Sequence, residues 1–148
     1  VRALDAAARV AVISNPALRP MFAGFEVVEL ADAGGGQSAS LRAGLAKARL
    51  ARPSKVLVVL ADMPAVTPGL LRQVVATVTN ALPAAATDGR RAMPPACFPA
   101  ATFDALAAVE GDSGARTLIG ALPASQLVLA PAEELRDVDR PADLPAAG

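Results

Sequence analysis

The sequence has no histidine, tryptophan or tyrosine, and it has a single cysteine, Cys97. Without histidine the chain cannot form a Ser-His-Asp triad, an imidazole metal site or a histidine acid–base pair. One cysteine excludes both an internal disulfide bond and a cysteine-rich zinc site. Any bound metal must therefore sit on oxygen ligands, which favours a hard ion such as magnesium.

Net charge and long apolar runs are also absent. The 14 basic and 14 acidic residues cancel, which argues against a non-specific nucleic-acid binder because such a protein needs surplus Lys and Arg. No apolar run reaches the roughly 18 residues that indicate a membrane span, and the first ten residues lack the order of a signal peptide. We therefore expect a cytoplasmic protein. Its 148 residues, 53% of them hydrophobic, suffice for one domain with one core.

Short apolar runs alternate with helical patterns along the chain. Strands are predicted over 10–14, 25–30, 55–60, 84–87, 96–98, 126–129 and 136–139. Helices are predicted over 38–49, 102–109 and 115–122, and a further one begins at Thr67-Pro68 with Thr67 as its N-cap. The continuous apolar run 55–60 is typical of a central strand covered on both faces. This alternation predicts an α/β fold with a mostly parallel sheet, whose ligands bind at the carboxyl ends of the strands.

The glycine-rich segment 34–39 follows the second predicted strand and precedes a helix. It can bring backbone N–H groups close to a nucleotide at the positive end of that helix. Its spacing also fits the dinucleotide fingerprint G-x-G-x-x-A, with Asp62 where a ribose-binding acid could stand. A flexible turn before a Ser-capped helix explains the same residues, so three interpretations are open.

Asp62 follows the strongest predicted strand, and Pro64 restricts the conformation of Met63 after it. A carboxylate at this place points into the ligand crevice and can hold magnesium against phosphates. The alternative is that Asp62 only caps a turn. Asp137 and Asp139 occupy alternate positions, so in an extended segment only one of them could join Asp62 at a metal. A solvated acidic turn is the alternative for this pair.

A second glycine-bearing loop, 111–116, also stands before a predicted helix. By itself this loop favours an ordinary helix start, with Asp112 or Ser113 as the N-cap.

Four segments in this order resemble the MobA-like nucleotidyltransferases, and within them the molybdenum cofactor cytidylyltransferases. They are GQSASLRAGL at 36–45, LADMP at 60–64, GDSGAR at 111–116 and DVDRPADL at 137–144. Their order disfavours the dinucleotide interpretation. The resemblance implies a single domain over 1–148 with a three-layer α/β/α, Rossmann-like fold. It also implies transfer of CMP, or GMP, from CTP or GTP to a phosphorylated molybdopterin-type cofactor, with release of pyrophosphate.

The resemblance implies that Asp62 and Asp139 are the catalytic acids and the magnesium ligands. This chemistry suits a chain without histidine, because transfer to a phosphate needs in-line positioning and charge neutralisation more than a strong base. A molybdoenzyme or a maturation protein would be the protein partner. Nucleic acid and membrane are not expected as partners.

The resemblance also implies two groups of binding residues. Gly36, Ser38 and Ser40 would lie against the base and ribose of the nucleotide. Asp112 and Arg116 would line the acceptor side.

The sequence departs from the family's pattern in two places that bear on function. It lacks the first strand and the loop carrying Arg and Lys that cradles the triphosphate, so a chain beginning at Val1 is expected to bind triphosphate very weakly. A catalytically inactive homologue that binds nucleotide or cofactor is therefore the alternative. The second departure, Ala92-Met93 between Arg91 and Pro94, puts the identity of the acceptor in question.

Overall fold

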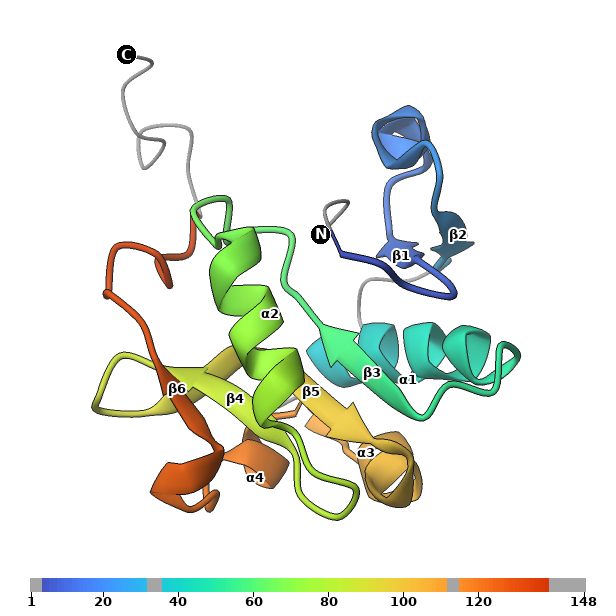
Figure 1. Ribbon diagram of the computed structural model, residues 1–148. Coiled ribbons are helices and arrows are strands. Elements are labelled where there is room, and N and C mark those ends of the chain that lie inside the picture. The colour runs from blue at the N-terminus through green and yellow to red at the C-terminus, as the bar shows by residue number, and fades with distance from the viewer. Residues whose placement is uncertain (1–3, 32–35, 112–114, 139–148) are drawn as a thin grey trace.

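The computed structural model describes residues 4–31, 36–111 and 115–138 (Figure 1). In chain order the elements are β1 (Val10–Ile13), η1 (Pro16–Phe22), β2 (Glu26–Glu29), α1 (Gly36–Arg49), β3 (Lys55–Val58), α2 (Pro68–Thr77), β4 (Ala84–Thr87), β5 (Ala92–Pro99), η3 (Ala100–Thr102), α3 (Phe103–Ala107), α4 (Arg116–Ile119), η5 (Ala124–Gln126) and β6 (Leu127–Leu129). None of these helices is long and apolar enough to cross a bilayer, within the described part of the chain.

The strands form two sheets. β1 and β2 pair in parallel, from Val10 opposite Glu26 to Ile13 opposite Glu29. The larger sheet has the order β3-β5-β4-β6. In it β4 and β6 are parallel, whereas β5 is antiparallel to both β3 and β4. β3, β4 and β6 therefore share one direction and β5 is the exception, so the predicted α/β fold with mostly parallel strands is confirmed.

Two hydrophobic clusters cover opposite faces of the larger sheet. Ala84 and Ala86 of β4 belong to the first cluster with residues of α2, whereas Ala85 belongs to the second with residues of α1, α3 and α4. This division follows from the strand itself, because successive side chains point to opposite faces. The helices therefore lie on both sides of the sheet (Figure 1), and the predicted three-layer, Rossmann-like arrangement is confirmed.

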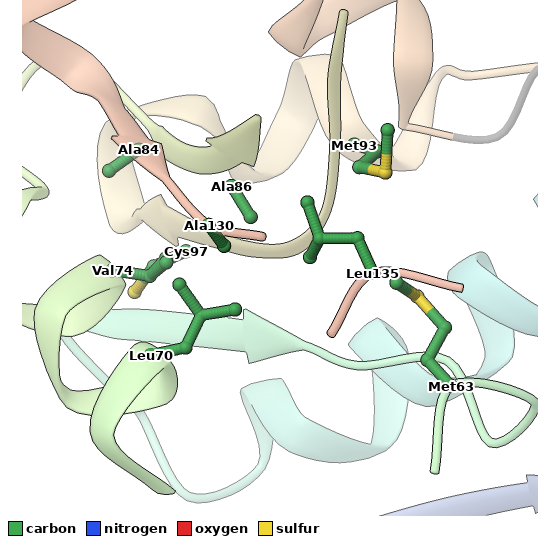
Figure 2. Close-up of a cluster of buried hydrophobic side chains, with 9 residues drawn as sticks. All are labelled: Met63, Leu70, Val74, Ala84, Ala86, Met93, Cys97, Ala130 and Leu135. Atoms are coloured by element: carbon green, nitrogen blue, oxygen red, sulfur yellow. The ribbon is translucent and has the colours of Figure 1, made fainter. Parts of the chain in front are cut away.

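The first cluster is drawn in Figure 2, where Leu70 and Val74 of α2 lie close to Cys97 of β5. Alanine on the neighbouring strand leaves room for these larger side chains to approach the sheet. Leu135, from a segment near the C-terminus, enters the same cluster beside Met63 (Figure 2).

A β-bulge interrupts the pairing of β4 with β5. Ala85 lies opposite Ala96, but the next residue, Ala86, lies opposite Met93. Pro94 and Pro95 are thus left out of the ladder, as expected for residues that have no N–H to donate. Met93 and Pro94 therefore lie at the start of β5, and each lines one of the two cavities described below.

Two sequence predictions about strands were wrong. β3 ends at Val58 and lies at the edge of its sheet, not in the centre. The strand is apolar throughout because Val56 and Leu57 pack against different clusters, on opposite faces of the sheet. The apolar run therefore indicates that both faces of the strand are covered, and it does not indicate a central position in the sheet. Residues 136–138 form no strand, because the N–H of Val138 bonds to the carbonyl of Asp62 and not to a neighbouring strand.

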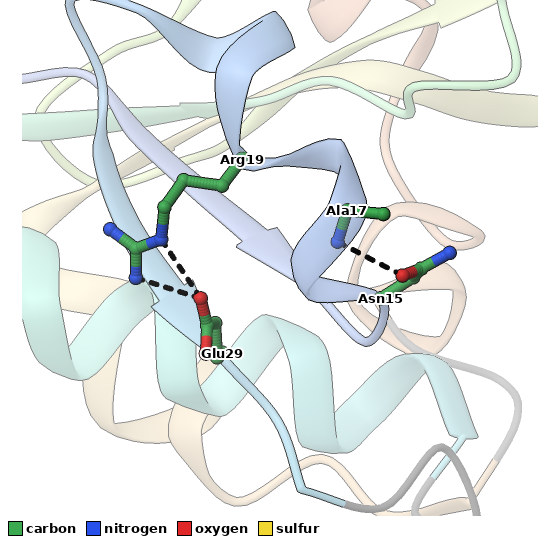
Figure 3. Close-up of polar contacts among 4 residues, drawn as sticks. All are labelled: Asn15, Ala17, Arg19 and Glu29. Carbon is green, nitrogen blue, oxygen red and sulfur yellow. Dashed lines mark hydrogen bonds and ion pairs between the residues drawn. The ribbon is translucent and has the colours of Figure 1, made fainter.

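The connection between β1 and β2 is held by local polar contacts (Figure 3). The side-chain oxygen of Asn15 accepts a hydrogen bond of 3.0 Å from the N–H of Ala17 at the start of η1. Arg19 donates to Glu29 at the end of β2, with a distance of 2.8 Å between the charged atoms. These contacts fix the return of the chain that makes β1 and β2 parallel.

Candidate active site

Asp62 lies in a turn after β3, and its side chain is exposed. Its backbone carbonyl accepts a hydrogen bond of 2.7 Å from the N–H of Val138. This bond joins two parts of the chain that are distant in sequence. It brings Asp137, the residue before Val138, to the same edge of the sheet as Asp62.

Residues 131–138, which we call the C-terminal strap, are fastened to the segment after Asp62 at a second point. Oε1 of Glu134 accepts a hydrogen bond of 2.9 Å from the N–H of Thr67 and a further one from the Thr67 hydroxyl. Oγ1 of Thr67 in turn accepts a bond of 3.2 Å from the N–H of Leu70. The predicted N-cap of α2 is therefore confirmed, and a carboxylate of the strap stands at the positive end of that helix.

Apolar packing provides a third fastening point. Leu135 is 4% exposed and Met63 is 5% exposed, and both belong to the cluster of Figure 2. The strap thus holds residues 62–67 through one backbone bond, one carboxylate and one buried side chain. These contacts hold the backbone of Asp62 in place, although its side chain is exposed.

A cavity of about 360 Å³ lies between the strap and the turn that joins β4 to β5. Its lining consists of Asp88, Arg91, Met93, Ala132, Glu133, Leu135, Arg136 and Asp137. We call it the larger cavity. Within the turn, Oδ1 of Asp88 accepts bonds of 2.9 and 3.1 Å from the N–H groups of Arg90 and Arg91. These two bonds hold the pKa of the Asp88 carboxyl below its ordinary value.

A cavity of about 50 Å³, the smaller cavity, lies near the start of α1. It is lined by Gln37, Leu41, Val58, Leu60, Pro94, Ala115 and Arg116. Met93 lines the larger cavity and Pro94 the smaller one, so adjacent residues of β5 belong to different cavities. Asp62 lines neither cavity, but it follows Leu60 of the smaller one and bonds to the strap that walls the larger one.

Of the predicted site residues that the structure describes, Arg116 lines the smaller cavity, whereas Gly36, Ser38, Ser40 and Asp62 line neither cavity. Gly36 opens α1 with a φ of +63°, and Arg116 shares the smaller cavity with Gln37 of the first turn of α1. Ser38, also in that turn, is 1% exposed, and Ser40 is half-buried.

Two predicted residues, Asp112 and Asp139, lie outside the described residues. Their roles, like those of the other site residues, stay predictions.

The described edge of the sheet thus carries an exposed carboxylate, Asp62, after β3, together with two cavities that Asp62 itself does not line. The sequence matches the model of the MobA-like NTP transferase domain over residues 1–127. The chain belongs to this family. Membership implies a nucleotidyltransferase that binds a nucleoside triphosphate, and the family commonly uses a divalent metal. A search of the curated proteins found no match.

The donor atoms of this MobA-like domain fit a hard divalent cation. The single cysteine is buried, and burial raises the pKa of the Cys97 thiol to about 11, so it offers no thiolate at neutral pH. Over residues 4–31, 36–111 and 115–138, no group of three or more Cys, Asp or Glu side chains could enclose a metal.

Several residues of the site were missed by the sequence analysis. Gln37 lines the smaller cavity, Arg91 and Arg136 line the larger one, and Glu134 fastens the strap. The contact between Glu134 and Thr67 joins residues 67 positions apart, so no local sequence pattern could predict it. For Gln37 a signal existed, because it lies inside the GQSAS segment beside the serines that were chosen.

Proposed function

We propose that this chain is a magnesium-dependent nucleotidyltransferase that moves CMP, or GMP, from CTP or GTP to a phosphorylated molybdopterin-type cofactor. One observation supports the proposal above the others: the 2.7 Å bond from Val138 to Asp62, which sets the acidic strap beside the strand-end carboxylate. In a MobA-like NTP transferase, this edge of the sheet is where ligands bind.

The proposed roles of the acids follow from this edge. Asp62 and Asp139 would hold the magnesium ion, whose chemistry when bound is to neutralise charge on the triphosphate. Asp137 is the described acid nearest to Val138 in sequence and lines the larger cavity. It is the alternative to Asp139 in that role, because in an extended segment only one of these two alternate residues could join Asp62.

The transfer step needs little acid–base help from the protein. An oxygen of the acceptor phosphate forms a bond to the α-phosphorus, and the bond from that phosphorus to the bridging α–β oxygen breaks. Its electron pair leaves with pyrophosphate. The acceptor phosphate is already anionic at neutral pH, so no strong base must remove a proton. The absence of histidine from the chain is consistent with this step.

The nucleotide would lie against the start of α1. The N–H groups of a 14-residue helix point toward this end and favour bound phosphate. Gly36, Ser38 and Ser40 are the proposed contacts, and we add Gln37 because its side chain lines the smaller cavity. Asp112 and Arg116 are proposed on the acceptor side of the same edge.

The experiment compares pyrophosphate release by the wild type and by Asp62→Asn, with CTP or GTP, magnesium and metal-free molybdopterin. We expect the variant to lose at least about 100-fold in rate, or about 2.7 kcal/mol. Because Asp62 is exposed, the far-UV circular dichroism and the Tm should not change. Asp5→Asn, which changes another exposed acid, serves as the control and should keep full activity.

The competing proposal is an inactive homologue that binds nucleotide or cofactor. It predicts that calorimetry detects binding of CTP while pyrophosphate is not released. A wild-type rate in Asp62→Asn would contradict the assigned role of Asp62. For the active enzyme we propose a cytoplasmic location and a molybdoenzyme or maturation protein as partner; co-purification with such a protein is the test.

A further inference from the structure

Two arginines of α1 reach across to α3 and to the residues that follow it. Arg42 and Arg49 stand about two helical turns apart and share one side of α1. Nη2 of Arg49 lies 2.8 Å from Oδ1 of Asp104, and Nη1 of Arg42 donates a hydrogen bond of 3.3 Å to the carbonyl oxygen of Val109. The proposed transfer step uses neither contact. We propose that Arg42 is a positioning residue, which through Val109 holds Arg116 beside the start of α1.

The contacts of α1 show that it runs in the direction opposite to the chain from α3 to α4. Its end contacts the first turn of α3 through Arg49. Its middle contacts Val109, after the end of α3, through Arg42. Its first turn shares the smaller cavity with Arg116, the first residue of α4. Of the two arginine contacts, that of Arg42 is therefore the nearer to Arg116 along both segments.

The carbonyl of Val109 is a group that α3 leaves without a helical donor. Helical bonds run from an N–H to the carbonyl four residues before it, and α3 ends at Ala107, so no N–H of α3 can bond to this carbonyl. Val109 is buried, and a buried carbonyl without a partner costs free energy. The guanidinium of Arg42 supplies the partner from another helix. Without that donor, the chain that leads to Arg116 loses a contact with α1.

The smaller cavity joins the two proposed groups of binding residues, and at this step the inference rests on the proposed function. Gln37, a proposed nucleotide contact, and Arg116, proposed on the acceptor side, both line this cavity. The nucleotide contacts belong to α1 itself, so they keep their places without the bond from Arg42 to Val109. Arg116 belongs to the segment that this bond holds. Arg42 should therefore affect binding of the acceptor and not binding of the nucleotide.

The test compares three variants with the wild type. Arg42→Met removes the donor but keeps an unbranched side chain, Arg42→Lys keeps a charged donor, and Arg49→Met, the matched control, removes the other arginine contact. Both arginines are exposed, so all variants should keep the far-UV circular dichroism of the wild type. In pyrophosphate release, Arg42→Met should raise the KM for metal-free molybdopterin about tenfold, as for one lost charge-assisted bond, and leave the KM for CTP or GTP unchanged. Arg42→Lys should restore most of this loss, and Arg49→Met should change neither KM.

Hydrogen exchange supplies a readout that does not depend on activity. The N–H of Leu118 bonds to the carbonyl of Ala115 at 3.0 Å, and the N–H of Gly120 bonds to the carbonyl of Arg116 at 2.8 Å. If Arg42 holds this segment, both amides should exchange faster in Arg42→Met than in the wild type or in Arg49→Met.

Four results would overturn the inference: unchanged exchange of the two amides in Arg42→Met, an equal rise of both KM values, the same effects in Arg49→Met, or no rescue by lysine at position 42. Failure of the proposed function is a different result. If the wild type releases no pyrophosphate but the two amides exchange faster only in Arg42→Met, Arg42 still positions Arg116 and the transferase fails. If the wild type releases pyrophosphate and Arg42→Met leaves the KM for the acceptor unchanged, the transferase stands and the inference fails.

Discussion

Removal of the Glu134 side chain tests whether the strap holds the Asp62 segment. Glu134→Ala deletes two hydrogen bonds to Thr67 but leaves the bond from Leu70 to Thr67 that caps α2. Loss of a capping interaction costs about 0.5–2 kcal/mol, and solvent exposure of the contact reduces the electrostatic part. We therefore expect the free energy of unfolding to fall by about 0.5–1.5 kcal/mol, or the Tm by about 1–6 °C.

The assay for Glu134→Ala is urea unfolding followed by far-UV circular dichroism, because the chain has no tryptophan or tyrosine to report by fluorescence. Glu133→Ala is the control. Glu133 is an exposed neighbour on the cavity side of the strap, and its removal should change stability by less than about 0.5 kcal/mol. Glu134→Gln keeps an acceptor oxygen and should lose less than the alanine variant.

Hydrogen exchange supplies a local readout for the same variants. In Glu134→Ala the amides of Thr67 and Val138 should exchange faster, since both are held by contacts between the strap and residues 62–67. If the two alanine variants prove equally stable and exchange at the same rate, Glu134 does not fasten the strap and the reasoning fails.

Three further predictions concern the core. Leu106→Ala should cost about 2–5 kcal/mol in urea unfolding, because Leu106 is fully buried and its truncation leaves a cavity; a cost below about 1 kcal/mol would contradict this. Gly44→Val should lower the Tm, because even a Cβ at Gly44 would lie 3.0 Å from Cγ2 of Val12, and an unchanged Tm would show that β1 and α1 separate easily. Cys97 should resist thiol reagents at pH 8 until urea is added. Because burial raises its pKa from 9.0 to about 11, the unfolded chain loses the proton first, so the free energy of unfolding should fall as pH rises from 9 to about 11.

Elements that depend on neighbouring residues were predictable from the sequence. Thr67-Pro68 specifies the start of α2 through a side-chain cap and a proline that needs no hydrogen bond. The run 55–60 correctly indicated β3, because apolar residues on both faces imply cover from both sides. Its place at the edge of the sheet could not be read from the same run, since which strands pair is decided by contacts distant in sequence.

The candidate site likewise contains residues that local sequence could indicate and residues that only the fold brings together. Asp62 was found because a carboxylate after an apolar strand is visible in sequence. Arg91 and Arg136 were missed because a turn and an irregular segment carry no periodicity, and only the fold places them around one cavity. The strap was predicted to end in a strand, but a single backbone bond to Asp62 replaces the ladder that this strand would have needed.

The strap explains how one irregular segment can serve stability and binding together. Glu134 and Leu135 fasten it to the start of α2 and to the core. Glu133, Arg136 and Asp137 face the larger cavity. An irregular backbone suits this division, because a strand would impose strict alternation and a helix would spread these side chains over several faces. Substitution of the charged side chains can therefore alter what the cavity binds, while Glu134 and Leu135 keep Asp62 in place.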